Sequence, residues 1–344
     1  MILDPKLDNP NAVVVTKLQV PDLPAEHDFK TAAGQIVTAL GIVFEGERVV
    51  FKPNVTIGQR FKDPDSGITT HPAFVHGLIS AVQERGAGKT YILEDPLNTD
   101  RNRPRSWRGT GYREVAAATG ARLRCPKTYT CVEKSVPDHM IHPTLKVSRL
   151  AVDPGAVLIN VPKLKTHNLA VTTLSMKNLM GVVNAPDRHF CGQAWEALPK
   201  EMKASDRTRT ETSDRAVHEE WQRGLAARLA DTAKVIRPRL HIVEGVVGRD
   251  GTGFRRGQNY PMGLVVAGVN AVAVDSVASY LMGFEPGAII YLQSAVEAGL
   301  GVTDLGKISI FTADNGQLVP LSSLEKWRAR SVFNLITRLR GDPN

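Results

Sequence analysis

Residues 71–95, HPAFVHGLISAVQERGAGKTYILED, decide the fold, because they place an amphipathic helix directly before a short buried strand. Pro72 suits the first turn of the helix, and glycines follow its last turn. The apolar run that comes next predicts a strand with Asp95 at its carboxyl end. The apolar residues of the helix recur at the spacing of one helical face: Phe74, Val75, Leu78, Ile79 and Val82.

The same alternation of short apolar strands and helices recurs along the chain. Such an order is typical of an α/β fold, in which helices cover both faces of a mostly parallel sheet. We therefore predict this fold class, with a helical or irregular insertion. Further strands are expected at 47–55, 156–161, 240–245, 263–268 and 306–314, and further helices at 110–121, 225–236 and 270–284.

Composition divides the chain into five stretches. Residues 1–46 form an N-terminal segment, 47–183 the first part of the core, and 236–315 its second part. The polar residues 184–235 are predicted to form an insertion or a lid, and 316–344 a basic C-terminal helix. No run of about 18 apolar residues occurs, so we expect no membrane-spanning helix.

The three cysteines, Cys125, Cys131 and Cys191, cannot form a disulfide framework, and their spacing lacks the CxxC pattern of zinc and ferredoxin-type sites. We therefore expect a cytoplasmic protein without an iron–sulfur cluster. The nucleotide-binding patterns GxGxxG and GxxxxGKS/T do not occur either, so no nucleotide cofactor is expected.

The net charge of +8 favours an anionic partner, either nucleic acid or a small anionic substrate. The densest basic stretch, 100–113, mixes arginines with aromatic residues, and it either binds nucleic acid or forms a solvated loop beside a site. We favour the loop, and with it the small substrate. The members of this stretch are Arg101, Arg103, Arg105, Arg108 and Arg113, with Trp107 and Tyr112 between them.

A second basic group lies in PKLKTH (162–167), directly after a predicted apolar strand. Neighbouring positive charges lower the pKa of a lysine, which then acts as a base or forms a Schiff base; a lysine can also simply bind a carboxylate or phosphate. A histidine there can transfer protons near neutral pH or bind a metal. Because ligands of parallel sheets bind beyond the carboxyl ends of the strands, we expect one site at this edge. Its expected members are Lys163, Lys165, His167, Asn54 and Asp95.

Two further segments offer groups that suit an anion. In TLSMKNLMG, a predicted helical turn places Lys177 and Asn178 within one turn of Ser175, and such a rim can bind an oxyanion. In SGITTHPAF, Thr70 and His71 lie at a helix start, where free N–H groups and the helix dipole favour an anion.

Three acidic residues stand out by their surroundings. Glu244 and Asp250 follow a predicted strand in a glycine-rich stretch, where they either bind a cation or pair with lysines. Asp275 lies in an otherwise apolar helix and therefore needs a buried partner, such as a lysine or an arginine.

We predict an enzyme of isomerase or lyase type that acts on a small carboxylate- or phosphate-bearing substrate by acid–base chemistry of lysine and histidine. One alternative is an enzyme with a divalent metal held by His71, His167, His189 and Asp95, and another is a nucleic-acid-binding protein. Whether the chain forms a homo-oligomer stays open. The predicted catalytic residues are Lys163, Lys165, His167, Lys177 and Asp95, and the predicted substrate-binding residues are Asn54, Thr70, His71, Ser175 and Asn178.

Several of these stretches together resemble the domain-of-unknown-function family 362. They are FKPNV, the helix-and-strand unit quoted first, VLINVPKLKTHNLAVTTLSMKNLMGVV, IVEGVVGRDGTGFRRG and VVAGVNAVAVDSVASYLMGFEP, and they run from about residue 47 to 305. Many members of this family carry added ferredoxin-type cysteine motifs, which this sequence lacks. The resemblance therefore implies no iron–sulfur cluster here, and it implies that the α/β body has binding or chemistry of its own.

Overall fold

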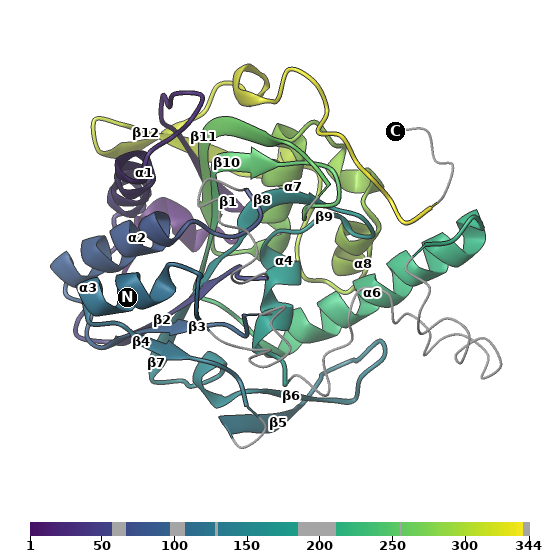
Figure 1. Cartoon of the computed structure of the whole chain (residues 1–344), viewed down its shortest axis with the longest axis horizontal. Helices are drawn as coiled ribbons and strands as arrows, with labels where there is room; N and C mark the ends of the chain where they lie inside the picture. The colour runs from purple at the N-terminus through teal and green to yellow at the C-terminus, as the bar shows by residue number, and fades with distance from the viewer. Residues whose placement is uncertain (57–66, 97–106, 128–129, 185–210, 255, 340–344) are drawn as a thin grey trace.

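The computed structural model describes the chain except for residues 57–66, 97–106, 128–129, 185–210, 255 and 340–344. Its centre is a large sheet (Figure 1) with the strand order β13-β12-β1-β11-β10-β7-β2-β3-β4. The strands of this path are β1 (Ala12–Lys17), β2 (Arg48–Pro53), β3 (Thr90–Leu93), β4 (Arg122–Arg124), β7 (Ala156–Val161), β10 (Leu240–Arg249), β11 (Asn259–Gly268), β12 (Ser309–Asp314) and β13 (Gln317–Pro320).

Parallel pairing dominates the half of the sheet in which the predicted site lies. β4, β3, β2, β7 and β10 are joined by successive parallel pairs. β11 reverses the direction, because it forms an antiparallel hairpin with β10 and also pairs antiparallel with β1. The predicted α/β class with a mostly parallel sheet is therefore confirmed.

Helices cover both faces of the sheet. α1 (Glu26–Ala39), α2 (Pro72–Glu84) and α3 (Tyr112–Thr119) lie on the left of the sheet in Figure 1. α4 (Ser175–Asn178), α6 (Arg215–Val235), α7 (Ala271–Leu281) and α8 (Ile290–Glu297) lie on the right. The alternation of side chains along β2 explains both layers, since Val49 and Phe51 pack with α1 and α2, whereas Val50 packs into a core on the opposite face.

Residues 1–46, delimited by the sequence only as an N-terminal segment, belong to this core. They supply β1, which lies between β11 and β12, and α1, which packs against α2. The hairpin β5 (Cys131–Ser135) and β6 (Thr144–Ser148) forms a separate small sheet. None of the helices in the described part of the chain is long and apolar enough to cross a membrane.

The predicted basic C-terminal helix is wrong over the residues that the structure describes. After β13 the chain forms a short 3-10 helix, Glu325–Trp327, and then continues without a helix to Leu339. Its backbone bonds to other elements instead, as when the N–H of Phe333 donates to the carbonyl of Met282. Tertiary hydrogen bonds and the burial of single apolar side chains here outweigh the helical spacing of the sequence.

The polar stretch 184–235 is described only in part, because residues 185–210 lie outside the described ranges. The helix expected at 225–236 is present as α6, which begins ten residues earlier, at Arg215. Asp214 caps it by accepting from the N–H groups of Ala216 and Val217.

Candidate functional site

The lysine and histidine residues of PKLKTH lie in a strand rather than in a loop after one. β8 (Lys163–His167) pairs in parallel with β10 and antiparallel with the two-residue strand β9 (Val171–Thr172). Side chains alternate along a strand, so Lys163, Lys165 and His167 point to one face and Leu164 to the other. Leu164 is accordingly packed in the apolar core that contains α7. The strand predicted at 156–161 is thus followed by a second strand, which carries these three residues on one face.

Lys163 forms a buried ion pair with Glu244. Its ammonium donates to Oε2 of Glu244 at 2.6 Å, and the two side chains are 1% and 0% exposed. The same carboxylate accepts from the backbone N–H groups of His71 and Val246. Burial lowers the pKa of Lys163, and the charge of Glu244 opposes this change. Of the two roles predicted for Glu244, pairing with a lysine is therefore the one that the structure contains.

Lys165 has a different environment, because its close polar partners are neutral. Its Nζ donates to the carbonyl of Ile68 at 2.6 Å and to Oδ1 of Asn54 at 3.1 Å, and it lies 3.4 Å from Oγ1 of Thr56. Burial, followed by the charges of Lys177 and other cations, holds the pKa of Lys165 well below its usual value.

His167 is held as a neutral imidazole with a defined tautomer. Its Nδ1 accepts from the backbone N–H groups of Leu169 and Ala170, both at 3.1 Å, so the ring proton belongs on Nε2. Burial, and then the charges of Lys177, Arg338 and Lys165, keep the pKa of His167 well below its usual value. The ring therefore offers an N–H donor at Nε2, and protonation would cost it the two backbone hydrogen bonds.

A pocket of about 220 Å³ lies where these elements meet, beyond the carboxyl ends of β2 and β3. This is the edge at which open α/β sheets bind ligands. Its wall is formed by six parts of the chain. They are the segments after β2 and β3, the end of β8, the region of α4, the tip of the β10–β11 hairpin and the C-terminal segment. The lining residues are Asn54, Val55, Thr56, Glu94, Asp95, His167, Thr173, Lys177, Asn178, Met180, Gly181, Phe254 and Arg338.

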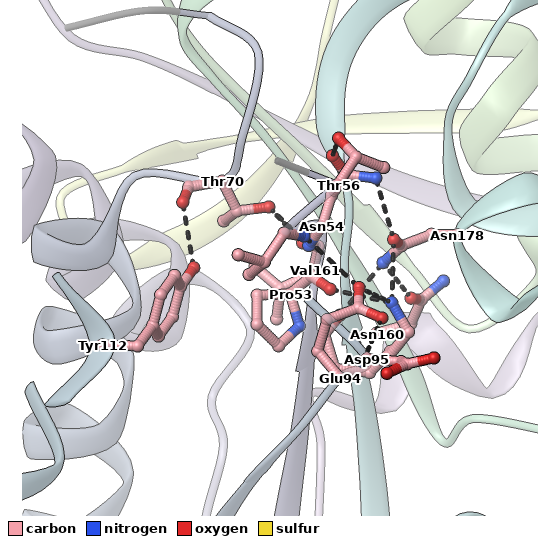
Figure 2. Close-up of polar contacts among 12 residues, drawn as sticks. Pro53, Asn54, Thr56, Thr70, Glu94, Asp95, Tyr112, Asn160, Val161 and Asn178 are labelled. Atoms are coloured by element: carbon pink, nitrogen blue, oxygen red, sulfur yellow. Dashed lines mark hydrogen bonds and ion pairs between the residues drawn. The ribbon is translucent and has the colours of Figure 1, made fainter. Parts of the chain in front are cut away.

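A buried hydrogen-bond network fixes the floor of this pocket (Figure 2). Nζ of Lys52 donates to Glu94 at 2.5 Å and to Oδ1 of Asn178 at 3.0 Å. The amide of Asn178 in turn donates to Oδ1 of Asn160 and to the carbonyl of Lys52. Asn54 donates its amide to Oδ1 of Asn178, and Figure 2 shows these side chains converging. The pocket-lining amides are thereby held in one orientation.

The buried carboxylate of Asp275 holds the first residues of α4 in position. Its carboxylate accepts from the backbone N–H groups of Ser175 (2.6 Å) and Met176 (3.1 Å) and from the hydroxyl of Tyr291 (3.2 Å). The expected lysine or arginine partner is thus replaced by backbone and phenol donors. Burial raises the pKa of Asp275 to about 7, although these hydrogen bonds oppose the change. α4 carries Lys177 and Asn178, so this carboxylate supports two residues of the pocket wall.

The structure brings part of the predicted site together. Lys165 lies directly behind the pocket wall, since it contacts the lining residues Asn54 and Thr56. Lys163, His71, Thr70 and Ser175 lie elsewhere: Thr70, for instance, bonds to the backbone of Asn54 and Val161 (Figure 2). The predicted residues that line the pocket are Lys177, His167, Asp95, Asn54 and Asn178.

The residues proposed as metal ligands that the structure describes are not gathered into one group. Among the described residues, no set of three or more His, Cys, Asp or Glu side chains is arranged to hold a metal ion. His71 stacks on Phe29 at a centroid distance of 3.8 Å, whereas His167 and Asp95 line the pocket. His189 lies outside the described residues, as does Cys191.

The aromatic residues of the arginine-rich stretch are part of the core. Trp107 and Tyr112 are buried, and the hydroxyl of Tyr112 donates to the carbonyl of Thr70 (Figure 2). Neither ring is therefore available to stack on a base. The arginines at 101, 103 and 105 lie outside the described residues.

Sequence reasoning did not assign several residues to the site. The sequence does point to Lys52 and Glu94, because each is a charged residue at the end of an apolar strand. Such a residue needs a partner when it is buried. Phe254 and Arg338 carried no such signal. They reach the pocket through the β10–β11 hairpin tip and the C-terminal segment, and their position depends on tertiary packing alone.

The family comparison and one related protein agree with the resemblance seen in the sequence. A thylakoid-associated protein from Synechocystis sp. is 28% identical over 258 residues, which cover 75% of this chain and 70% of that protein. A crystal structure of a Thermotoga maritima protein matches 76% of this chain at 12% identity with a TM-score of 0.42, and this chain spans 60% of that protein's length. Residues 49–280 match the model described as domain of unknown function (DUF362). The chain therefore belongs to the DUF362 family.

Proposed function

We propose that this chain is an enzyme that binds a small carboxylate- or phosphate-bearing substrate in the pocket and transfers a proton to or from it. The observation that carries the proposal is the convergence of Lys177, Arg338 and His167 on one pocket at the carboxyl edge of the sheet. The reaction class that suits these groups is an acid–base conversion, as in isomerases and lyases.

The proposed anion-binding part of the site consists of the positive charge of Lys177 and the N–H donor of His167. Within the part of the chain that the structure describes, Lys177 has no ion-pair partner, although it lies beside two groups whose pKa its charge lowers. An anion beside Lys177 would relieve this repulsion. His167 adds a neutral N–H donor at Nε2, a form of histidine that polarises an oxygen without carrying charge itself. Its proposed role is therefore donation to the substrate rather than removal of a proton.

Asp95 is the residue that we assign to proton transfer. The residue lines the pocket and is 6% exposed, and its backbone N–H donates to the neighbouring Glu94. Lys165, which lies behind Thr56 and whose pKa is lowered by burial, is the second acid–base group that we propose. Lys163 has no proposed catalytic role, since its ion pair with Glu244 lies away from the pocket.

The change Lys177→Met is expected to weaken binding of inorganic phosphate and of small carboxylates about tenfold or more. A hydrogen bond to a charged group contributes about 1.5–3 kcal/mol, and 1.4 kcal/mol corresponds to tenfold in Kd. Isothermal titration calorimetry of the purified chain measures this directly. The matched control is Lys89→Met, which removes the same charge from an exposed residue just before β3, at the opposite edge of the sheet. Equal affinities for wild type and Lys177→Met would contradict the proposed binding site.

We also propose a cytoplasmic location, which rests on the cysteine usage of the sequence. The Synechocystis relative is described as thylakoid-associated, so a membrane-bound state of this chain is the competing outcome. Fractionation of the producing cells with an antibody against the native chain separates the two. Recovery with the membranes after a wash at moderate salt would overturn the proposal.

A further inference from the structure

The C-terminal segment, residues 328–339, crosses the molecule as a strap that is hydrogen-bonded at both ends. At its start, the N–H of Ala329 donates to the carbonyl of Leu281 at the end of α7. In its middle, the N–H of Gly251 donates to the carbonyl of Asn334 at 2.8 Å, next to the β10–β11 hairpin tip. At its end, the N–H of Arg338 donates to the carbonyl of Asn168, one residue after β8. The strap therefore joins α7, the hairpin and the site strand.

One aromatic side chain anchors the strap between these ends. Phe333 is 3% exposed and stacks on Tyr260 of β11 with ring centroids 4.6 Å apart. Gly248 of β10 makes room for this ring, because a Cβ atom at that position would lie 3.0 Å from it. The apolar anchor and the backbone hydrogen bonds hold the strap in place.

The strap brings a second cation to the pocket. Arg338 lines the pocket, and its charge is among the causes that lower the pKa of His167, after that of Lys177. The two cations come from different parts of the chain: Lys177 lies on α4, within the residues 49–280 that match the family model, whereas Arg338 lies outside them. The strap therefore adds a charge to a pocket whose other walls belong to the shared domain.

We propose that Arg338 determines specificity by binding a second anionic group, so that the chain selects small dianionic substrates such as dicarboxylates or phosphorylated carboxylates. This inference rests on the proposed function, in which Lys177 and His167 bind the first anionic group. A guanidinium suits the role because its planar fork binds a carboxylate or phosphate through two parallel hydrogen bonds. Glu94, which also lines the pocket, is paired with Lys52 at 2.5 Å.

The test compares a dicarboxylate with a monocarboxylate on the same variants. Malonate and acetate are titrated calorimetrically into the wild-type chain, Arg338→Met and Arg338→Lys. The control is Arg330→Met, which removes an exposed arginine from the same strap. We expect Arg338→Met to weaken malonate binding about tenfold and to change acetate binding by less than about threefold. The malonate affinity of Arg338→Lys should lie between those of the wild type and Arg338→Met, because the ammonium retains the charge but lacks the planar pair of donors. The affinities of Arg330→Met should match those of the wild type.

The possible outcomes separate this inference from the proposed function. If the wild type binds both anions and Lys177→Met weakens both, but Arg338→Met leaves the malonate-to-acetate ratio unchanged, the specificity role of Arg338 is wrong and the anion site stands. If the wild type binds neither anion, both proposals fail. A loss of thermal stability in Arg338→Met with equal weakening of both anions would assign Arg338 a structural role and overturn the inference.

Discussion

Replacing Lys163 by methionine is expected to lower the free energy of unfolding by about 3–5 kcal/mol, because it leaves the carboxylate of Glu244 buried without its counter-charge. Both side chains are almost completely buried, and the pair is joined at 2.6 Å. The carboxylate would keep its backbone donors, the N–H groups of His71 and Val246, and these do not neutralise it. Urea unfolding followed by circular dichroism measures the change.

Two further variants make this result specific to the buried charge. Lys163→Met combined with Glu244→Gln should recover part of the loss, since the amide carries no charge yet still accepts a backbone hydrogen bond. Lys307→Met breaks an exposed pair with Asp304 and should change stability little. If Lys163→Met were as stable as Lys307→Met, Lys163 would not be the structural residue described above, and its earlier assignment to catalysis would need to be reconsidered.

The second prediction with a large effect is that the free energy of unfolding depends on pH through the titration of Asp275. The pKa of Asp275 is raised to about 7 in the folded chain, so the native state retains a proton that the unfolded state loses near pH 4. Stability from this group is therefore fully present below about pH 4 and is lost as the pH rises to about 7. The total change is up to about 4 kcal/mol by linkage, and burial is its largest cause.

Asp275→Asn removes this titration and serves as the reference. The difference in free energy of unfolding between wild type and Asp275→Asn, measured in urea from pH 4 to pH 8, should fall steadily to about pH 7 and then level off. Other carboxylates titrate equally in both chains and cancel. A difference that stays constant with pH would show that Asp275 titrates normally and that its burial beneath Ser175 and Met176 is incomplete.

Local patterns were sufficient to predict much of the fold. The apolar runs at 48–53 and 156–161 are short, continuous and followed by polar residues, which suits buried parallel strands. The stripe from Phe74 to Val82 indicates a helix, because its spacing repeats within a few residues. Even the approach of Asn54 and Asp95 followed from the sequence, since parallel strands end at the same edge of a sheet.

Other features depend on partners far along the chain. PKLKTH becomes β8 because its backbone pairs with β10, about eighty residues later. A stretch with two lysines and a histidine gives little sequence signal for such pairing. The C-terminal segment has helical spacing, but Phe333 finds a site on Tyr260, and its backbone bonds to α7 and to the hairpin.

The sequence by itself therefore determined the α/β class, the edge of the sheet at which the pocket lies, and several of the polar residues that line it. Tertiary structure alone decided which of three lysines pairs with Glu244, which is buried among neutral polar partners, and which faces the pocket. The reason is physical: helix and strand periodicity is a property of neighbouring residues, whereas the pKa and partners of a buried charge depend on groups that the fold brings together from distant parts of the chain.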